Sequence, residues 1–277
     1  MKEKMKMKYT KKEVEKLLEG FNPNTAKTIA NGKSKAIYRT KVDGVCLMEF
    51  KPSLRSITYK RKGNIVGTEK ERMKACLELY LYLEKQGVPT QLLHDEIILI
   101  DRRYFMLIKA AKQIPIEWIA RYYASGSITR LFPTLAKDGQ KFDVPLLKFD
   151  LKQEAEIGGV DDPMLNESYI VGLNLLKRED LETCKKLLLK IANALDEKFK
   201  KADFTLVDLK MELGYDVEGD GKIILTDEIS QDCMRVNDSK GNSITKDVFR
   251  EWQTENDVLK AYQKFTKVVS FDENKGL

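Results

Sequence analysis

Charged side chains lie close together in one predicted hairpin of the chain. Asp208, Lys210 and Glu212 share one face of a strand, because side chains of a strand alternate with period two. The turn at 218–221 is rich in glycine and acidic residues that accept positive φ, and it returns Asp227 to within a rung or two of Glu212. Carboxylates and a lysine at this spacing suit a site for a metal ion and a phosphate, whereas a solvated strand face is the plainer alternative.

The same hairpin imitates a calcium loop. Positions 1, 3, 5, 6 and 12 of an EF-hand are matched by Asp216, Glu218, Asp220, Gly221 and Asp227. An EF-hand needs a helix on each side, and the incoming segment instead alternates as a strand. Its second face is predicted to be apolar and consists of Thr205, Val207, Leu209, Met211 and Leu213. We therefore expect a strand pair, not a calcium site.

A short glycine turn near the N-terminus places two lysines in alternation. Gly32, Lys33 and Lys35 lie between two predicted strands, so both lysines are expected to face one ligand. A P-loop is excluded, because its first glycine would fall at Lys27 and no helix pattern follows. A glycine-rich cover over phosphates is physically similar, and a plain hairpin tip is the alternative.

Another candidate anion site lies near residue 125. Arg121 is followed by Gly126, Ser127 and Arg130. Backbone donors beside a planar guanidinium fork can share one phosphate. Arginines at surface turns are otherwise usually only solvated.

Composition limits the class of protein. The 277 residues are 42% hydrophobic and 33% charged, with a net charge of +6, which is ordinary for a globular protein with an ample core. Four scattered cysteines without a CxxC pair argue against zinc and disulfides and favour a reducing cytoplasm. No apolar run is long enough to cross a membrane, and the basic N-terminus lacks the apolar centre of a signal peptide.

The elements predicted around these residues form an α+β protein of two lobes, 1–112 and 113–277. Helices are expected over Lys11–Leu18, Glu69–Lys85, Glu179–Lys201, a short stretch capped by Asn166, and most of Thr245–Phe271. Strands are expected at Ile29, Lys35–Arg39, Val45–Phe50, Glu96–Asp101, Tyr104–Lys109 and Leu147–Leu151. The basic segment Lys51–Gly67 is expected to be a mobile loop that closes on ligand.

Three separated stretches together resemble one family. GKSKAIY (32–38) resembles its GKTKxxY, and IEWIARYYASGSITR (116–130) resembles its segment of Arg, Gly-Ser and a basic residue. VDLKMELG (207–214) and LTDEISQDCMR (225–235) resemble its DFKxEFG and D-E-x-x-x-D-S-x-R. The family is phosphoribosylaminoimidazole-succinocarboxamide synthase (SAICAR synthetase), and the likeness looks closest to the synthetase half of the bifunctional animal enzyme.

This resemblance implies a two-lobed fold, similar to ATP-grasp proteins and kinases, with antiparallel sheets and an ATP cleft between the lobes. It implies ATP-dependent joining of L-aspartate to the carboxylate of carboxyaminoimidazole ribonucleotide (CAIR) through an acyl phosphate. The implied cofactors are ATP and Mg²⁺, and the partners are these small molecules, with no nucleic acid and no membrane. A homo-oligomer is compatible with it.

The resemblance also implies roles for individual residues. The ATP-binding set is Gly32, Lys33, Lys35, Lys210, Glu212 and Asp227, of which Glu212 and Asp227 would hold Mg²⁺. The substrate-binding set is Arg121, Ser127, Asp162 and Arg235. The catalytic pair is Asp208 and Lys210, where Asp208 is either a base for the incoming amine or an orienting group.

Three departures from the family pattern lie on the substrate side. Cys233 replaces a serine, Asn237 replaces a tryptophan, and Lys51–Ser56 lacks the family's loop aspartate. They keep open a second hypothesis, a relative that binds nucleotide without ligating. A third hypothesis is a nucleic-acid binder that uses residues 51–74, which contain eight basic and two acidic residues. Such a binder would need aromatic residues between the basic ones, and Tyr59 is the one that this segment offers.

Overall fold

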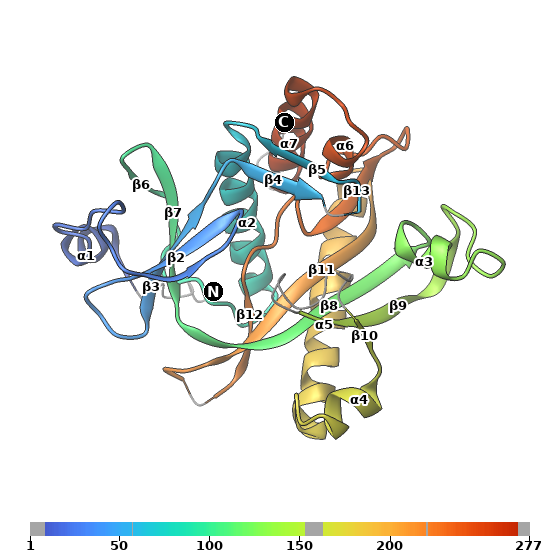
Figure 1. Ribbon diagram of the computed structural model, residues 1–277, viewed down its shortest axis with the longest axis horizontal. Coiled ribbons are helices and arrows are strands. Elements are labelled where there is room, and N and C mark those ends of the chain that lie inside the picture. The colour runs from blue at the N-terminus through green and yellow to red at the C-terminus, as the bar shows by residue number, and fades with distance from the viewer. Residues whose placement is uncertain (1–8, 57, 153–162, 220, 271–277) are drawn as a thin grey trace.

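The computed structural model describes residues 9–56, 58–152, 163–219 and 221–270 (Figure 1). The helices of these residues are α1 (Lys11–Leu17), α2 (Thr68–Lys85), α3 (Ser127–Leu131), α4 (Glu167–Gly172), α5 (Arg178–Lys201), α6 (Asp247–Arg250) and α7 (Glu255–Val269). The strands are β1 (Thr28–Asn31), β2 (Lys35–Arg39), β3 (Val45–Phe50), β4 (Ser53–Ser56), β5 (Arg61–Asn64), β6 (Ile98–Ile100), β7 (Arg103–Lys109), β8 (Ala111–Tyr123), β9 (Lys141–Leu151), β10 (Met164–Leu165), β11 (Phe204–Asp216), β12 (Ile223–Thr226) and β13 (Met234–Asp238).

Two antiparallel sheets form the framework, so the predicted α+β class is confirmed. The first sheet has the order β1-β2-β3-β7-β6, and the second has the order β10-β9-β8-β11-β12 with β13 also paired to β11. The long strands β8 and β11 run side by side through the second sheet (Figure 1). Each of the two contributes candidate site residues.

Local sequence signals explain where several helices begin. Thr10 caps α1 with a reciprocal capping box, in which its side chain accepts from the backbone of Glu13 and the Glu13 carboxylate accepts in return. Asn166 caps α4 with its side-chain oxygen, which accepts a hydrogen bond from the backbone N–H of Tyr169 without a reciprocal partner. Both starts agree with the sequence-based prediction.

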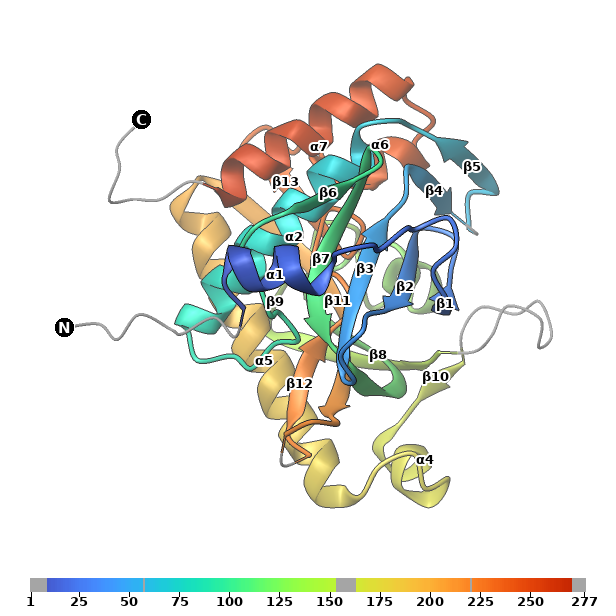
Figure 2. The ribbon, with the colours of Figure 1, turned by 90° about the vertical axis from the view of Figure 1, so that its left-hand side faces the viewer.

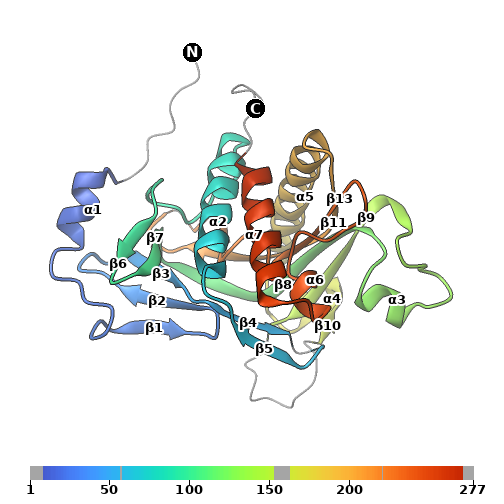
Figure 3. The ribbon, with the colours of Figure 1, turned by 90° about the horizontal axis from the view of Figure 1, so that it is seen from above.

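Three helices cover one side of the sheets. Viewed from above, α2, α7 and α5 stand next to one another over the sheets (Figure 3). The apolar stripe of α5 packs on the buried face of β11, and Phe199 of α5 meets Phe265 of α7 with ring centroids 5.6 Å apart. Figure 2 shows α1 against the first sheet, where Val14 and Leu17 join a smaller cluster with Phe105.

The hairpin of β11 and β12 forms as predicted, with a correction to its faces. Glu212 pairs with Thr226, which places Asp227 beside it, and strands rather than helices flank the turn. A bulge between Leu206 and Asp208 interrupts the alternation. Leu206 is therefore buried in the core, and Val207 faces a cavity instead.

The prediction of a mobile loop at Lys51–Gly67 is wrong for its described residues. They form the hairpin β4–β5, which packs against the C-terminal helices through a cluster of Leu54, Ile65, Phe249, Val258 and Tyr262. Some basic side chains of residues 51–74 are also used inside the protein. Arg72 is fully buried, and Arg61 lies over the rings of Phe249 and Trp252.

The largest buried cluster draws residues from both sides of position 112, from Cys46 to Val269. The division into lobes 1–112 and 113–277 stays a prediction. Within the described ranges, no helix combines the length and the apolar character required to cross a membrane.

Candidate active site

A cavity of about 380 Å³ lies between the glycine turn and the central hairpin, and we call it the hairpin cavity. Its lining is Ala30, Gly32, Ser34, Lys35, Ile37, Lys152, Lys210, Met211, Glu212, Asp227, Glu228, Asp232, Cys233 and Lys246. Five predicted site residues meet here, namely Gly32, Lys35, Lys210, Glu212 and Asp227. The sequence separation of these residues shows that the fold, not local spacing, assembles the cavity.

Lys35 of β2 is the central cation of the hairpin cavity. Its Nζ lies 2.5 Å from Asp227 Oδ2 and 2.9 Å from Glu228 Oε1. Burial lowers the pKa of Lys35, but these two carboxylates outweigh it and hold the pKa well above its usual value. Burial raises the pKa of Asp227, but Lys35 reverses the direction and the pKa lies below its usual value. Both groups are therefore charged at neutral pH.

Glu212 and Asp227 are adjacent carboxylates with unequal surroundings. Both Glu212 oxygens accept from Lys152 Nζ, at 2.5 and 2.6 Å. The pKa of Glu212 is nevertheless raised, first by burial and then by the negative charge of Asp227. Two hard oxygen donors that repel each other form a donor set that a divalent cation fits.

Asp227 adopts an unusual backbone conformation at this point. Its φ is +60°, in the left-handed region that non-glycine residues seldom adopt. Its carbonyl accepts hydrogen bonds from the Tyr80 hydroxyl and from Gln91 Nε2, the latter at 3.0 Å. These contacts hold the strained turn that directs the Asp227 carboxylate into the hairpin cavity.

The other lysines differ in placement. Lys210 Nζ donates to Glu117 Oε1 at 2.6 Å across β8 and β11. Burial lowers the pKa of Lys210, but Glu117 outweighs it and leaves the pKa raised. Lys33 lies in the turn before β2, is exposed, and is not among the residues that line the hairpin cavity. The expected alternation of Lys33 and Lys35 fails, because the strand begins only at Lys35. The role of Lys33 stays a prediction.

Two arginines meet one carboxylate on the neighbouring rung. Asp208 Oδ2 accepts from Arg235 Nη1 at 2.6 Å and lies 3.3 Å from Arg121 Nη2. Arg121 Nη1 also donates to the carbonyl of Ser125 at 2.8 Å. Burial lowers the pKa of Arg121 despite Asp208, whereas Asp208 and Asp247 outweigh burial at Arg235 and raise its pKa.

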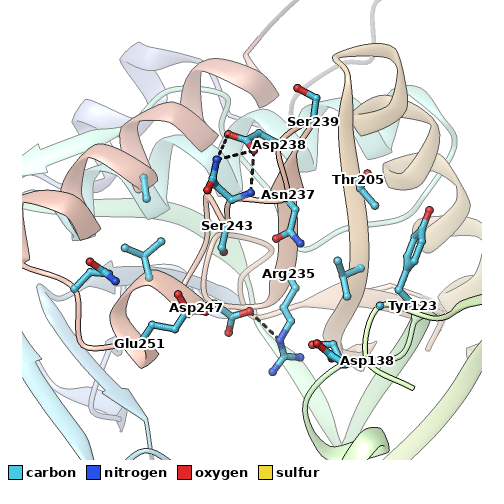
Figure 4. A pocket seen from close by; sticks show the side chains of 18 of the residues that line it. Tyr123, Asp138, Thr205, Arg235, Asn237, Asp238, Ser239, Ser243, Asp247 and Glu251 are labelled. Atoms are coloured by element: carbon cyan, nitrogen blue, oxygen red, sulfur yellow. Dashed lines mark hydrogen bonds and ion pairs between the residues drawn. The ribbon is translucent and has the colours of Figure 1, made fainter. Parts of the chain in front are cut away.

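A second cavity of about 810 Å³ opens beside Arg235, and we call it the arginine cavity. Figure 4 shows Arg235 and Asp247 pointing toward each other in its wall, with 3.0 Å between Arg235 Nε and Asp247 Oδ2. Asp247 is held in turn by Arg250 at 2.6 Å. A Cβ at Gly126 would lie 2.9 Å from Arg235 Nη2, so this position needs glycine for the close approach and for its φ of +67°.

Two predicted substrate residues are less defined by the structure. Ser127 is the first residue of α3, one position beyond Gly126, and is not in the lining of either cavity. Asp162 lies outside the described residues.

A family comparison agrees with this geometry. A sequence model of SAICAR synthetase matches residues 28–268. The chain belongs to the SAICAR synthetase family. As a member, it is an ATP-dependent ligase of purine biosynthesis.

Individual members of the SAICAR synthetase family match over most of their length. The phosphoribosylaminoimidazole-succinocarboxamide synthase of Methanosarcina acetivorans is 37% identical over 86% of this chain and 94% of its own. That of Sulfolobus acidocaldarius is 32% identical over 88% of this chain and 98% of its own.

Solved structures show the same fold. The enzyme of Ehrlichia chaffeensis has a TM-score of 0.78 at 28% identity and covers 88% of this chain and 98% of its own. A SAICAR synthetase (Type-2) in complex with ADP has a TM-score of 0.73 at 25% identity, over 88% of this chain and 97% of its own. The relatives named here are archaeal and bacterial, so the expected likeness to the animal bifunctional enzyme is not supported.

Several side chains of the SAICAR synthetase site carried no predicted role. These are Arg72, Glu117, Lys152, Glu228, Asp232, Lys246 and Asp247. Glu228 and Asp232 belong to the D-E-x-x-x-D motif, so the motif could have identified both as site residues. No sequence pattern identified Arg72, because a lysine- and arginine-rich helix gives no indication of which cation is buried.

Proposed function

We propose that this chain joins L-aspartate to the carboxylate of CAIR, with the hairpin cavity holding the nucleotide and the arginine cluster holding the ribotide. The observation that carries the proposal is the meeting of Lys35, Lys210, Glu212 and Asp227 in one cavity, one rung from Asp208 and its two arginines. A phosphoryl donor and an anionic acceptor need such neighbouring cationic groups.

The nucleotide is assigned to the hairpin cavity on its charges. Lys35 and Lys210 offer ammonium groups to phosphate oxygens, and Gly32 allows close backbone approach. The matched structure with ADP is that of another member of the family, and it supports nucleotide binding in this one.

Glu212 and Asp227 are the residues that would hold Mg²⁺. Magnesium keeps several waters and is bound through one or two carboxylates and substrate phosphates. When bound, it would neutralise charge on the transferred phosphoryl group. No cluster of three or more metal-ligating side chains occurs in the part of the chain that is described.

Arg121, Ser127 and Arg235 are assigned to the phosphate or carboxylate of CAIR, and Asp162 to the substrate side by family likeness alone. Two guanidinium groups within reach of Asp208 are already oriented before an anion enters. A bidentate guanidinium–carboxylate contact fixes the acceptor in one orientation.

The reaction then follows in two displacements. An oxygen of the CAIR carboxylate attacks the γ-phosphorus of ATP, which forms the acyl phosphate and releases ADP. The aspartate amine attacks the acyl carbon, the C–O bond to phosphate breaks, and phosphate leaves as the amine loses a proton. The ammonium groups of Lys35 and Lys210 stabilise the transferred charge, with Lys210 also in the catalytic set.

Asp208 is assigned an orienting role rather than the role of base. Its carboxylate is buried and engaged by the guanidinium groups of Arg121 and Arg235, so it is committed to these two contacts rather than to the incoming amine. A proton from the amine would therefore leave to water or phosphate.

The deciding experiment is a coupled assay with purified protein. We expect magnesium-dependent release of ADP and phosphate that requires both CAIR and L-aspartate. ADP binding by calorimetry without turnover, under conditions where an archaeal relative turns over, would instead favour the non-ligating relative. Two departures from the family pattern motivate this alternative outcome, since Cys233 lines the hairpin cavity and Asn237 lines the arginine cavity.

A cytoplasmic location and the two-lobe division belong to the same proposal. Cys46, Cys76, Cys184 and Cys233 are all free thiols, as a reducing compartment allows. Limited proteolysis would test a boundary near residue 112, and size-exclusion chromatography would test for a homo-oligomer.

A further inference from the structure

One arginine of α2 is buried behind the hairpin cavity without lining it. Arg72 is 0% exposed, and its Nη1 lies 3.6 Å from Glu228 Oε1 and 3.5 Å from Asp232 Oδ2. Its Nη2 donates to the carbonyl of Lys51. Its Nε has no hydrogen-bond partner among the described residues. A buried cation with an unsatisfied donor is costly, so a purely structural position would be filled more favourably by an apolar side chain.

The two carboxylates that Arg72 contacts each hold a lysine in the hairpin cavity. Glu228 Oε1 accepts from Lys35 Nζ at 2.9 Å, and Asp232 Oδ2 accepts from Lys246 Nζ at 3.0 Å. All four of these residues line the cavity. Arg72 therefore shares both carboxylate oxygens with the lysines that face the ligand.

The second oxygen of each carboxylate is also fixed. Glu228 Oε2 accepts from Ser230 Oγ at 2.7 Å, and Asp232 Oδ1 accepts from the Tyr262 hydroxyl at 2.5 Å. Tyr262 belongs to α7, which packs against α2. The orientation of both carboxylates is thus set from behind the cavity by α2 and α7.

We propose that Arg72 is a positioning residue for nucleotide binding, which acts on Lys35 through Glu228 and on Lys246 through Asp232. Competition from the guanidinium limits how strongly each carboxylate draws its lysine inward. Both ammonium groups then stay at the cavity wall, available to phosphate oxygens. The inference rests on the proposed function only in that the hairpin cavity takes the nucleotide.

Removal of the guanidinium should weaken nucleotide binding more than it slows chemistry. We expect Arg72→Met to weaken ADP binding, and to raise the KM for ATP, by about tenfold, which corresponds to about 1.4 kcal/mol. The kcat at saturating ATP and the KM for aspartate should change less than threefold. Arg72→Lys keeps a charge but lacks the planar fork, so it should recover part of the loss.

A matched control exists in the first sheet. Arg103 is half-buried and paired with Glu49 at 2.6 Å and with the Tyr38 hydroxyl, but it does not line either cavity. Arg103→Met should lower thermal stability while ADP affinity stays at the wild-type value. A loss of ADP affinity in this control equal to that in Arg72→Met would reduce Arg72 to a structural role and overturn the proposal.

A double-mutant cycle tests the route through Glu228. The effects of Arg72→Met and Glu228→Gln on ADP affinity should be non-additive, because both act on the same ammonium group. Additive effects, or unchanged ADP affinity in folded Arg72→Met, would overturn the proposal. If Arg72→Met does not fold, Arg72→Lys takes its place in the cycle, and wild-type ADP affinity in that variant counts against the proposal. Wild-type protein that binds no ADP would remove the proposed nucleotide site itself, a result distinguishable from failure at Arg72 alone.

Discussion

Each cationic group of the site is held by a carboxylate from a different segment. Lys35 is held by Asp227, Lys210 by Glu117, and Arg235 by Asp208 together with Asp247. Buried charges persist only when they are paired, so these contacts keep the cations in place before any ligand arrives. An entering phosphate exchanges one anionic partner for another, which costs less than ordering a free lysine.

Glu212→Ala tests the proposed metal pair. The carboxylate is mostly buried and its neighbour Lys152 reaches solvent, so the fold should survive the change. Turnover should fall by at least about 10³-fold, because phosphoryl transfer depends on charge neutralisation at the metal. The ligation assay measures the rate, and circular dichroism reports the fold. A variant that keeps its rate would remove Glu212 from the metal site.

Asp247→Asn tests the support of Arg235. Loss of the charge weakens the contact to Arg235 Nε, so the guanidinium is less firmly held in the orientation that it shares with Asp208. We expect the KM for CAIR to rise by about tenfold, with the KM for ATP little changed. Asp138→Asn is the matched control, since Asp138 lines the same arginine cavity, while the ion pairs of Arg235 go to Asp208 and Asp247. Equal effects of the two substitutions would show that CAIR binding depends on the total charge of the arginine cavity and not on the contact between Asp247 and Arg235.

At the scale of elements, periodicity predicted the central hairpin and the helices α2, α5 and α7, because their apolar stripes are long. It did not predict β13 or the bulge between Leu206 and Asp208, since an extra residue in a strand leaves no local pattern. The ion pairs of Lys152 with Glu212 and of Arg72 with Asp232 join residues 60 and 160 positions apart. Such pairings depend on tertiary packing, which composition and spacing do not encode locally.

The hairpin β4–β5 was predicted as a mobile loop, because Pro52, Gly63 and Gly67 are strong breakers. Its buried anchors Leu54 and Ile65 are too few to form a period of their own. Leu54 and Ile65 are buried only because Phe249 and residues of α7 pack over them in the folded chain.

Phe249→Ala tests how firmly this hairpin is held. Phe249 is 0% exposed and also supports the Arg61 guanidinium 4.3 Å above its ring. Removal of a buried phenyl ring should cost about 3–5 kcal/mol of unfolding free energy. Urea denaturation measures it, and Val66→Ala, at a position 76% exposed, should stay within about 0.5 kcal/mol of wild type. A small effect at Phe249 would show that the hairpin packs only loosely on α6 and α7.

At the scale of the molecule, one buried cluster joins both sheets and the three covering helices, while ion pairs cross between segments distant in sequence. Lys109 of the first sheet contacts Asp216 of the second at 2.6 Å. Stability should therefore depend on the carboxylates of these pairs being ionised.

Acid should destabilise the whole fold through these carboxylates. Lys246 and Arg72 outweigh burial and hold the pKa of Asp232 far below its usual value. Lys109 and backbone N–H groups outweigh burial at Asp216 and lower its pKa. Lys264 lowers the pKa of Asp238 to about 2. Folded-state pKa values below the unfolded value of about 3.9 mean that the unfolded chain takes up protons first as the pH falls. The contribution of these carboxylates to the free energy of unfolding is thus complete above about pH 5 and is lost progressively from about pH 4 to pH 2.

Urea midpoints between pH 7 and pH 2.5 measure this loss, and we expect a steady fall that begins near pH 4.5. Asp216→Asn should show a shallower fall than wild type, because it has already lost the pair with Lys109 at every pH. Glu212 should act in the opposite direction, since burial and Asp227 raise its pKa and protonation relieves that repulsion. A midpoint that stays constant down to pH 3 would show that the paired carboxylates contribute no net stability, and that apolar burial alone holds the two sheets together.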